Sequence, residues 1–120
     1  MTKAFPKLAG LFDGISVRVP VVAGSIVDIT FIAKRGTTKE EINEILKKAA
    51  KEERWSGIFS VTEEELVSSD ILGSDFASIA DLNFTRVVGG NLVKVMAWYD
   101  NEMGYTNTLV EHVVKLGRLI

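Results

Sequence analysis

The chain has 120 residues, of which 47% are hydrophobic and 25% are charged, a composition typical of a folded globular domain. Its 14 basic and 16 acidic side chains give a net charge of −2, so a general attraction to nucleic acid or to an anionic membrane is not expected. No apolar run is as long as a membrane span and the first residues lack the apolar core of a secretory signal; we therefore expect one cytoplasmic domain over residues 1–120.

The first third of the chain predicts a lead-in and two strands. Residues 1–12 are interrupted by proline and glycine, which argues against a long helix there. Residues 15–19 alternate apolar and polar side chains and end at Pro20, as a strand does, and this pattern puts Arg18 on the polar side. Residues 25–34 are rich in β-branched and aromatic residues, and both faces of the strand they predict are largely apolar.

A helix over about residues 38–53 is the clearest element that the sequence predicts. Thr38 and Glu41 have the spacing of a reciprocal capping box at a helix start. The apolar residues that follow recur at helical spacing and form one stripe: Ile42, Ile45, Leu46, Ala49 and Ala50. We therefore expect this helix to pack by one face on the sheet.

The second half of the chain predicts more strands and a hairpin. Short apolar runs at residues 58–61 and 77–80 are each long enough for a brief strand. Residues 84–88 and 92–99 are longer runs, separated by Gly-Gly-Asn at 89–91, and these residue types favour a tight hairpin turn.

A second helix is predicted over about residues 103–116, preceded by Asp100-Asn101 as a cap and followed by Gly117 as a stop. The fold class is therefore α+β: a mostly antiparallel or mixed sheet, one helix packed on a face, and a C-terminal helix. Because the strands at 26–33 and 92–99 are apolar at nearly every position, two helices are too few to cover both faces of this sheet. We expect one face to meet another molecule or further chain.

The residue inventory excludes several kinds of active site. The sequence has no cysteine and a single histidine, His112, so it contains neither a thiolate nucleophile nor the ligands of a zinc-thiolate or multi-histidine metal site. His112 has no nucleophile or carboxylate placed with it by the sequence, and we interpret it as a packing or capping residue.

Three residues are candidates for ligand binding. Arg18 offers a guanidinium fork to a phosphate or carboxylate, although an arginine on a strand more often makes an ion pair. Asn101, at the start of the last helix, can pair with a planar amide, although Asp-Asn before a helix is usually only a cap. Tyr105 can stack on a ring or simply pack in the core.

The order of four motifs resembles the glyceraldehyde-3-phosphate dehydrogenase family. The resemblance covers essentially the whole chain and corresponds to the last third of that family's sequence. It rests on DGISVRVP at 13–20, SIVD at 25–28, EELVSSD at 64–70 and WYDNEMGY at 98–105.

The resemblance implies an enzyme that oxidises the aldehyde of a triose phosphate with NAD and inorganic phosphate, through a thioester, to an acyl phosphate. By the same resemblance Arg18 contacts phosphate, Asn101 holds the nicotinamide carboxamide, and Tyr105 packs beside the nicotinamide. Val21 and Gly24 depart from the residues that often follow the RVP segment in the family.

In that family the nucleophilic cysteine, its partner histidine and the Rossmann domain precede the region that this chain resembles, and His112 is not that histidine. The chain is therefore expected to be a C-terminal portion of the catalytic domain, inactive alone, with no tight binding of NAD or NADP. The family forms homotetramers in which the sheet meets a neighbouring subunit and the last helix lies against the Rossmann domain, so we expect self-association or a rearranged last helix. The alternatives are a stand-alone protein-interaction module with the same fold and a fragment of an erythrose-4-phosphate dehydrogenase.

Overall fold

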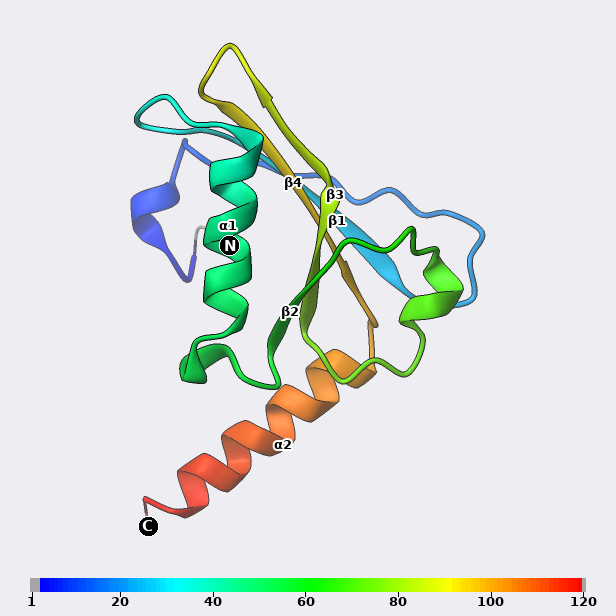
Figure 1. The fold of residues 1–120 in the computed structure, drawn as a ribbon. Helices are drawn as coiled ribbons and strands as arrows, with labels where there is room; N and C mark the ends of the chain where they lie inside the picture. The colour runs from blue at the N-terminus through cyan, green and yellow to red at the C-terminus, as the bar shows by residue number, and fades with distance from the viewer. Residues whose placement is uncertain (1–2, 120) are drawn as a thin grey trace.

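The computed structural model describes residues 3–119, which form a four-stranded mixed sheet, one helix on a face of it, and a second helix that extends away (Figure 1). The order of the strands is β1-β4-β3-β2; β4 is antiparallel to both β1 and β3, whereas β2 is parallel to β3. The predicted α+β class is confirmed. The elements in chain order are η1 (Pro6–Leu8), β1 (Ser25–Ile32), α1 (Lys39–Ala50), η2 (Glu53–Trp55), β2 (Phe59–Thr62), η3 (Ser68–Ile71), β3 (Ser78–Val88), β4 (Leu92–Tyr99) and α2 (Met103–Gly117), where η marks a 3₁₀ helix.

The strand predicted at residues 15–19 is wrong. These residues are irregular and exposed, and Ile15 is 90% and Val17 75% accessible to solvent. A strand needs a neighbour that accepts and donates its main-chain hydrogen bonds, and no strand within residues 3–119 pairs with this segment. An alternating pattern alone does not provide the partner strand. Arg18 therefore lies in an irregular segment and not on the polar side of a strand.

The two strands predicted at 77–80 and 84–88 are one strand, β3. Both of its ends pair with β4, and the register shifts between Asp81 and Arg86. An irregularity of this kind interrupts the apolar pattern without ending the strand. The predicted hairpin is confirmed: β3 turns into β4 at Gly89 and Gly90, whose φ angles of 58° and 80° suit a tight primed turn.

The core lies between α1 and the middle of the sheet. Its buried apolar side chains are Ala80, Leu82, Val93 and Ala97, with Val95 at the margin. Ile71, which is also buried, belongs to η3, and η3 contacts β4. Residues directly opposite in antiparallel strands share a face, so Val27, Ile29 and Phe31 of β1 lie on the same side as Ala97, Val95 and Val93.

The β1 part of this face is only partly covered. Helix α1 packs on β2 and β3, and the three β1 side chains remain between 38% and 48% exposed. The predicted shortage of cover for an apolar sheet is thus found at β1, the strand at the edge of the sheet.

The opposite face of the sheet is more polar. Lys94 of β4 donates a hydrogen bond of 2.5 Å to Asp28 of β1, and this contact lowers the pKa of the Asp28 carboxyl. On the same face the indole Nε1 of Trp98 donates to the buried carboxylate of Asp81 at 3.0 Å. A buried carboxylate needs such donors, and the main-chain amide of Asn83 supplies another at 3.0 Å.

The start of α1 is capped as predicted, but in one direction only. The Thr38 hydroxyl accepts from the main-chain amide of Glu41 at 3.2 Å. The Glu41 carboxylate does not return to Thr38; it accepts from the Arg35 guanidinium and, at 2.8 Å, from the Thr37 hydroxyl. A bidentate arginine is the stronger partner, so this contact replaces the second half of the capping box.

Glu41→Gln is expected to make the chain less stable at neutral pH and to have almost no effect in strong acid. The Arg35 and Thr37 contacts lower the pKa of Glu41 from its ordinary 4.5 to about 2. A depressed pKa stabilises the fold above the ordinary value, and this contribution is lost as the pH falls from 4.5 towards 2. The pair is exposed, so the effect is small. Melting temperatures of both proteins across this range test it: a difference that does not shrink in acid contradicts the assignment.

Candidate functional site

A shallow cavity of about 240 Å³ lies where the irregular segment before β1 meets the residues between β4 and α2. Its walls are residues 17–25 other than Pro20 on one side, and Asn101 with Glu102 on the other. Two of the three candidate residues, Arg18 and Asn101, are therefore brought together from segments that are far apart in the sequence.

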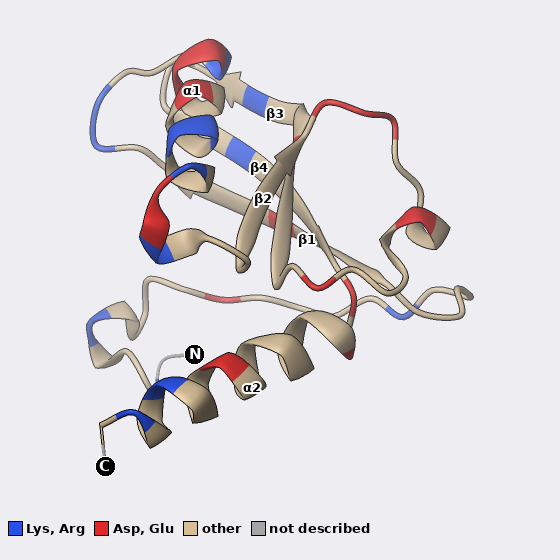
Figure 2. Ribbon diagram, turned by 60° about the horizontal axis from the view of Figure 1, so that its bottom comes forward, with Lys and Arg blue, Asp and Glu red and all other residues tan. Residues whose placement is uncertain are grey.

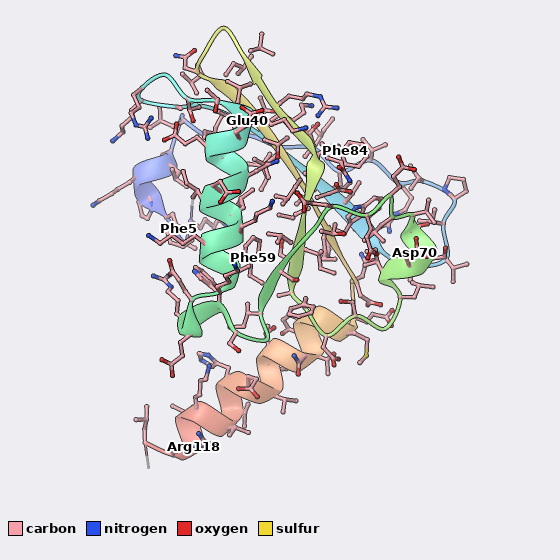
Figure 3. All side chains as sticks on the ribbon, viewed as in Figure 1. Phe5, Glu40, Phe59, Asp70, Phe84 and Arg118 are labelled. Carbon is pink, nitrogen blue, oxygen red and sulfur yellow. The ribbon has the colours of Figure 1, made fainter. Side chains whose placement is uncertain are left out.

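The 3₁₀ helix η3, which contains Asp70, lies well apart from α1 (Figure 3).

Asn101 is held in place by the first residue of β1. Its side-chain amide Nδ2 donates to the Ser25 hydroxyl at 2.8 Å. Ser25 is paired with Tyr99 at the end of β4, so the sheet itself brings the start of β1 next to the residues that follow β4. Ser25 was not a candidate from the sequence, because nothing in its local pattern distinguishes it from any other polar residue at the start of a strand.

Asp100 fixes the main chain beside Asn101. Its buried carboxylate accepts from the amides of Glu102 at 2.8 Å and Met103 at 2.9 Å, and its other oxygen accepts from the amide of Gly73 at 2.9 Å. The amides of Met103, Gly73 and Glu102 lower the pKa of Asp100, because hydrogen bonds to a carboxylate favour its charged form. The N-cap position itself is Glu102, whose side chain makes no capping bond, so the predicted cap acts from two residues earlier: Asp100 binds the first amides of α2.

Asp100→Asn is expected to lower the melting temperature at neutral pH by several degrees, and Asp100→Ala to lower it further. Asparagine retains one acceptor oxygen, so it can keep either the bonds to the amides at the start of α2 or the bond to the Gly73 amide. Alanine keeps neither. Since the pKa of Asp100 is depressed, the stabilisation is present at neutral pH and is lost as the carboxylate is protonated in acid. Thermal unfolding followed by circular dichroism measures the effect, with the exposed Glu65→Gln as control. Equal melting temperatures for all three variants would contradict the capping role.

Gly24 allows the segment before β1, which lines the cavity, to pack closely against η3. Its φ is +86°, a region that favours glycine, and a Cβ atom there would lie 3.1 Å from the main-chain oxygen of Ser68. The loop therefore lies directly against η3 at this buried position. The local backbone therefore accounts for the glycine at position 24.

Tyr105 is not part of this cavity. It lies in the first turn of α2, is 68% exposed, and is not among the residues that line the hollow. His112 is exposed in the second half of the same helix.

The residues of α2 that are not exposed lie in its first half, where Gly104 is buried and the Asn107 amide donates to the main-chain oxygen of Asp75 at 3.1 Å. Figure 2 shows the remainder leading away from the sheet, with few charged residues along it.

The cavity presents one cation and one anion. The guanidinium of Arg18 makes none of the hydrogen bonds or ion pairs found within residues 3–119, so its donors are available to a ligand. Glu102 is also among the lining residues, and its negative charge opposes an incoming anion. The site therefore has a donor set that suits a phosphate oxygen and an amide, but its net charge gives no strong attraction to an anion.

Residues 3–119 offer neither a membrane-spanning helix nor a metal-binding cluster. No helix among them is both long and apolar enough to cross a membrane. They also contain no group of three or more metal-ligating side chains placed to share an ion.

Comparison with known proteins agrees with the motifs. The family model described as "Glyceraldehyde 3-phosphate dehydrogenase, C-terminal domain" matches residues 1–101. The glyceraldehyde-3-phosphate dehydrogenase of Zymomonas mobilis is 43% identical over 115 residues, which is 96% of this chain and 34% of that protein. That of Borreliella burgdorferi is 46% identical over 112 residues, 92% of this chain and 33% of that protein. The chain spans about a third of the length of these relatives. It belongs to the glyceraldehyde-3-phosphate dehydrogenase family and matches the C-terminal domain of that family.

Proposed function

We propose that this chain provides one wall of the active site of a phosphorylating, NAD-dependent glyceraldehyde-3-phosphate dehydrogenase. Family membership supports the activity, since the relatives that cover nearly all of this chain carry that name. The observation that carries the proposal for the site is that Arg18 and Asn101 line one cavity, although the sequence separates them by β1, α1 and three further strands.

Arg18 is the proposed phosphate-binding residue. Its guanidinium presents several N–H donors in a fixed plane, a geometry that matches the oxygens of a phosphate. The residue is exposed on the cavity wall, so it can reach a phosphate group of the sugar substrate or inorganic phosphate.

Asn101 is the proposed nicotinamide-binding residue. One Nδ2 hydrogen is used by Ser25, and this bond fixes the plane of the amide. The second amide hydrogen and the carbonyl oxygen can then pair with the carboxamide of a nicotinamide ring. When bound, NAD supplies the hydride acceptor for aldehyde oxidation.

Tyr105 is the third proposed residue, packing beside the nicotinamide. It stands one turn after Glu102 on α2, so its exposed ring is on the element that follows the cavity wall. A ring in this position needs a further surface to hold it, and the proposal therefore expects Tyr105 to become buried when the rest of the active site is present.

The reactive groups of this chemistry must come from outside these 120 residues. The sequence has no cysteine, and a thioester route needs a thiolate to attack the aldehyde. We therefore expect the chain alone to be inactive and to bind NAD or NADP only weakly. The parent enzyme is proposed to be a cytoplasmic homo-oligomer, a tetramer as in the family, and to act on glyceraldehyde 3-phosphate.

Self-association of the isolated chain is expected at micromolar concentration. Two apolar surfaces are exposed: that of β1, with Ile29 at 48%, and that of α2, with Val113 at 60%. Light scattering measures the mass, and Ile29→Lys and Val113→Lys report separately on the two surfaces. Restoration of a monomer by one variant identifies the surface that associates; a wild-type chain that is already monomeric contradicts the expectation.

Complementation tests the proposed function. The part of the Zymomonas mobilis enzyme that precedes the region matched by this chain is co-purified with the chain, and NADH formation is measured with glyceraldehyde 3-phosphate, NAD and phosphate. Activity that appears only in the mixture supports the proposal, and erythrose 4-phosphate in the same assay tests the alternative substrate. A mixture that associates but forms no NADH from either sugar phosphate counts against an active-site role. Failure to associate, with another protein bound instead, favours an interaction module.

A further inference from the structure

We propose that Asp13–Gly14 is a site of spontaneous isoaspartate formation and therefore a substrate for a methyltransferase that recognises isoaspartyl residues. The proposal does not depend on the function given above. Among all aspartate and asparagine residues of the sequence, Asp13 alone is followed by glycine. Glycine has no Cβ atom to obstruct the approach of its nitrogen to the preceding side chain, and its backbone rotates freely.

The local geometry brings the two reacting groups together. The main-chain N–H of Gly14 donates a hydrogen bond of 2.8 Å to Oδ1 of Asp13, so the side-chain carboxyl group is folded back onto the nitrogen that would attack it. Both residues are exposed, and residues 13–19 belong to no helix or strand. Around Gly14 the nearest atom to a hypothetical Cβ is in the Phe12 ring, at 4.0 Å. The segment therefore has room to adopt the ring geometry that the reaction requires.

Other aspartates lack this combination. Asp81 and Asp100 are buried, and their carboxylates are tied by Trp98 and by the amide of Gly73 respectively. Asp28 lies within β1, where its carboxylate accepts from Lys94. Each of these three is followed by a residue with a side chain. Asp13 thus differs from these three aspartates in the residue that follows it, in its exposure and in its local structure.

The reaction needs only water as co-reactant. The Gly14 nitrogen attacks the side-chain carboxyl carbon of Asp13; a C–N bond forms, a C–O bond breaks, and one water molecule leaves with the amide proton, giving a cyclic imide. Hydrolysis adds one water molecule back. Opening at the side-chain carbonyl restores aspartate, and opening at the main-chain carbonyl leaves an isoaspartyl residue of unchanged mass, with one additional carbon in the backbone and a free α-carboxylate.

The experiment ages the purified 120-residue chain for weeks at neutral pH and physiological temperature. Protein isoaspartyl methyltransferase with labelled S-adenosylmethionine then marks isoaspartate, and trypsin releases residues 8–18 as one peptide, since it cleaves after Lys7 and Arg18. We expect the label to increase with time and to be concentrated in this peptide. Absence of label there, or equal labelling of peptides that contain other aspartates, overturns the proposal.

Three variants of exposed residues make the test specific. Asp13→Glu lengthens the side chain and disfavours the five-membered ring, so the label in this peptide should be lost. Gly14→Ala should lower it several-fold, because a Cβ now hinders the nitrogen. Asp75→Glu is the matched control and should leave it unchanged. Persistence of the label in Asp13→Glu would assign it to another residue and contradict the proposal.

Discussion

Arg18→Ala is expected to lower kcat/KM of the complemented enzyme for glyceraldehyde 3-phosphate about 10- to 100-fold, the loss expected when hydrogen bonds to a charged group are removed. The stability of the isolated chain should not change. Arg18 is exposed and makes no ion pair within residues 3–119, so nothing in the fold depends on its guanidinium. Steady-state NADH formation measures the first effect and thermal unfolding the second.

Two further variants make the Arg18 result specific. Arg18→Lys retains the charge but loses the planar pair of donors, so it should fall between wild type and alanine. Arg54→Ala is the matched control: this arginine is also exposed, and its guanidinium lies over the Trp55 ring, 4.4 Å from the centroid, away from the cavity lining. If Arg18→Ala and Arg54→Ala have the same kcat/KM, Arg18 does not bind the phosphate of the substrate.

The elements with a strong local pattern were predictable from the sequence. The α1 stripe, the Thr38 cap, the β3–β4 hairpin and the start of α2 at Met103 all follow from the chemistry of neighbouring residues. The local pattern was misleading at residues 15–19, because a strand forms only where a second strand pairs with it. The alternating residues would suit a place at the edge of the sheet, and β1 is an edge strand, but residues 15–19 do not pair with it.

The candidate site was predictable only in part. Arg18 and Asn101 were identified as candidates, but that they share a cavity follows from the pairing of Ser25 with Tyr99, which brings the two segments together. The support of Asn101 by Ser25 and the contact of Gly24 with Ser68 depend on residues distant in sequence, so no local pattern reveals them. Tyr105 was identified with the other two, and its position on α2 leaves it outside the cavity lining.

Gly104→Ala is expected to destabilise the chain by about 1–3 kcal/mol, the usual cost of adding volume to a packed site. A Cβ atom at this position would lie 2.6 Å from the main-chain oxygen of Phe76 and 3.0 Å from the Cα of Ala77. Both obstacles are backbone atoms, which cannot rotate away as a side chain can. Alanine is the better helix former by about 1 kcal/mol, but that gain is smaller than the cost of moving the first turn of α2.

Gly117→Ala is the control that separates these two effects. Gly117 ends the same helix, and nothing lies within 4 Å of a Cβ built there. Alanine at 117 should therefore leave stability unchanged or raise it by about 0.4–1 kcal/mol. Urea unfolding of both variants gives the two free energies. Because Gly104 is only two residues after Glu102, displacement of the first turn should also move the cavity wall, so Gly104→Ala should weaken complementation while Gly117→Ala does not. Two variants of equal stability would show that α2 does not begin against Phe76.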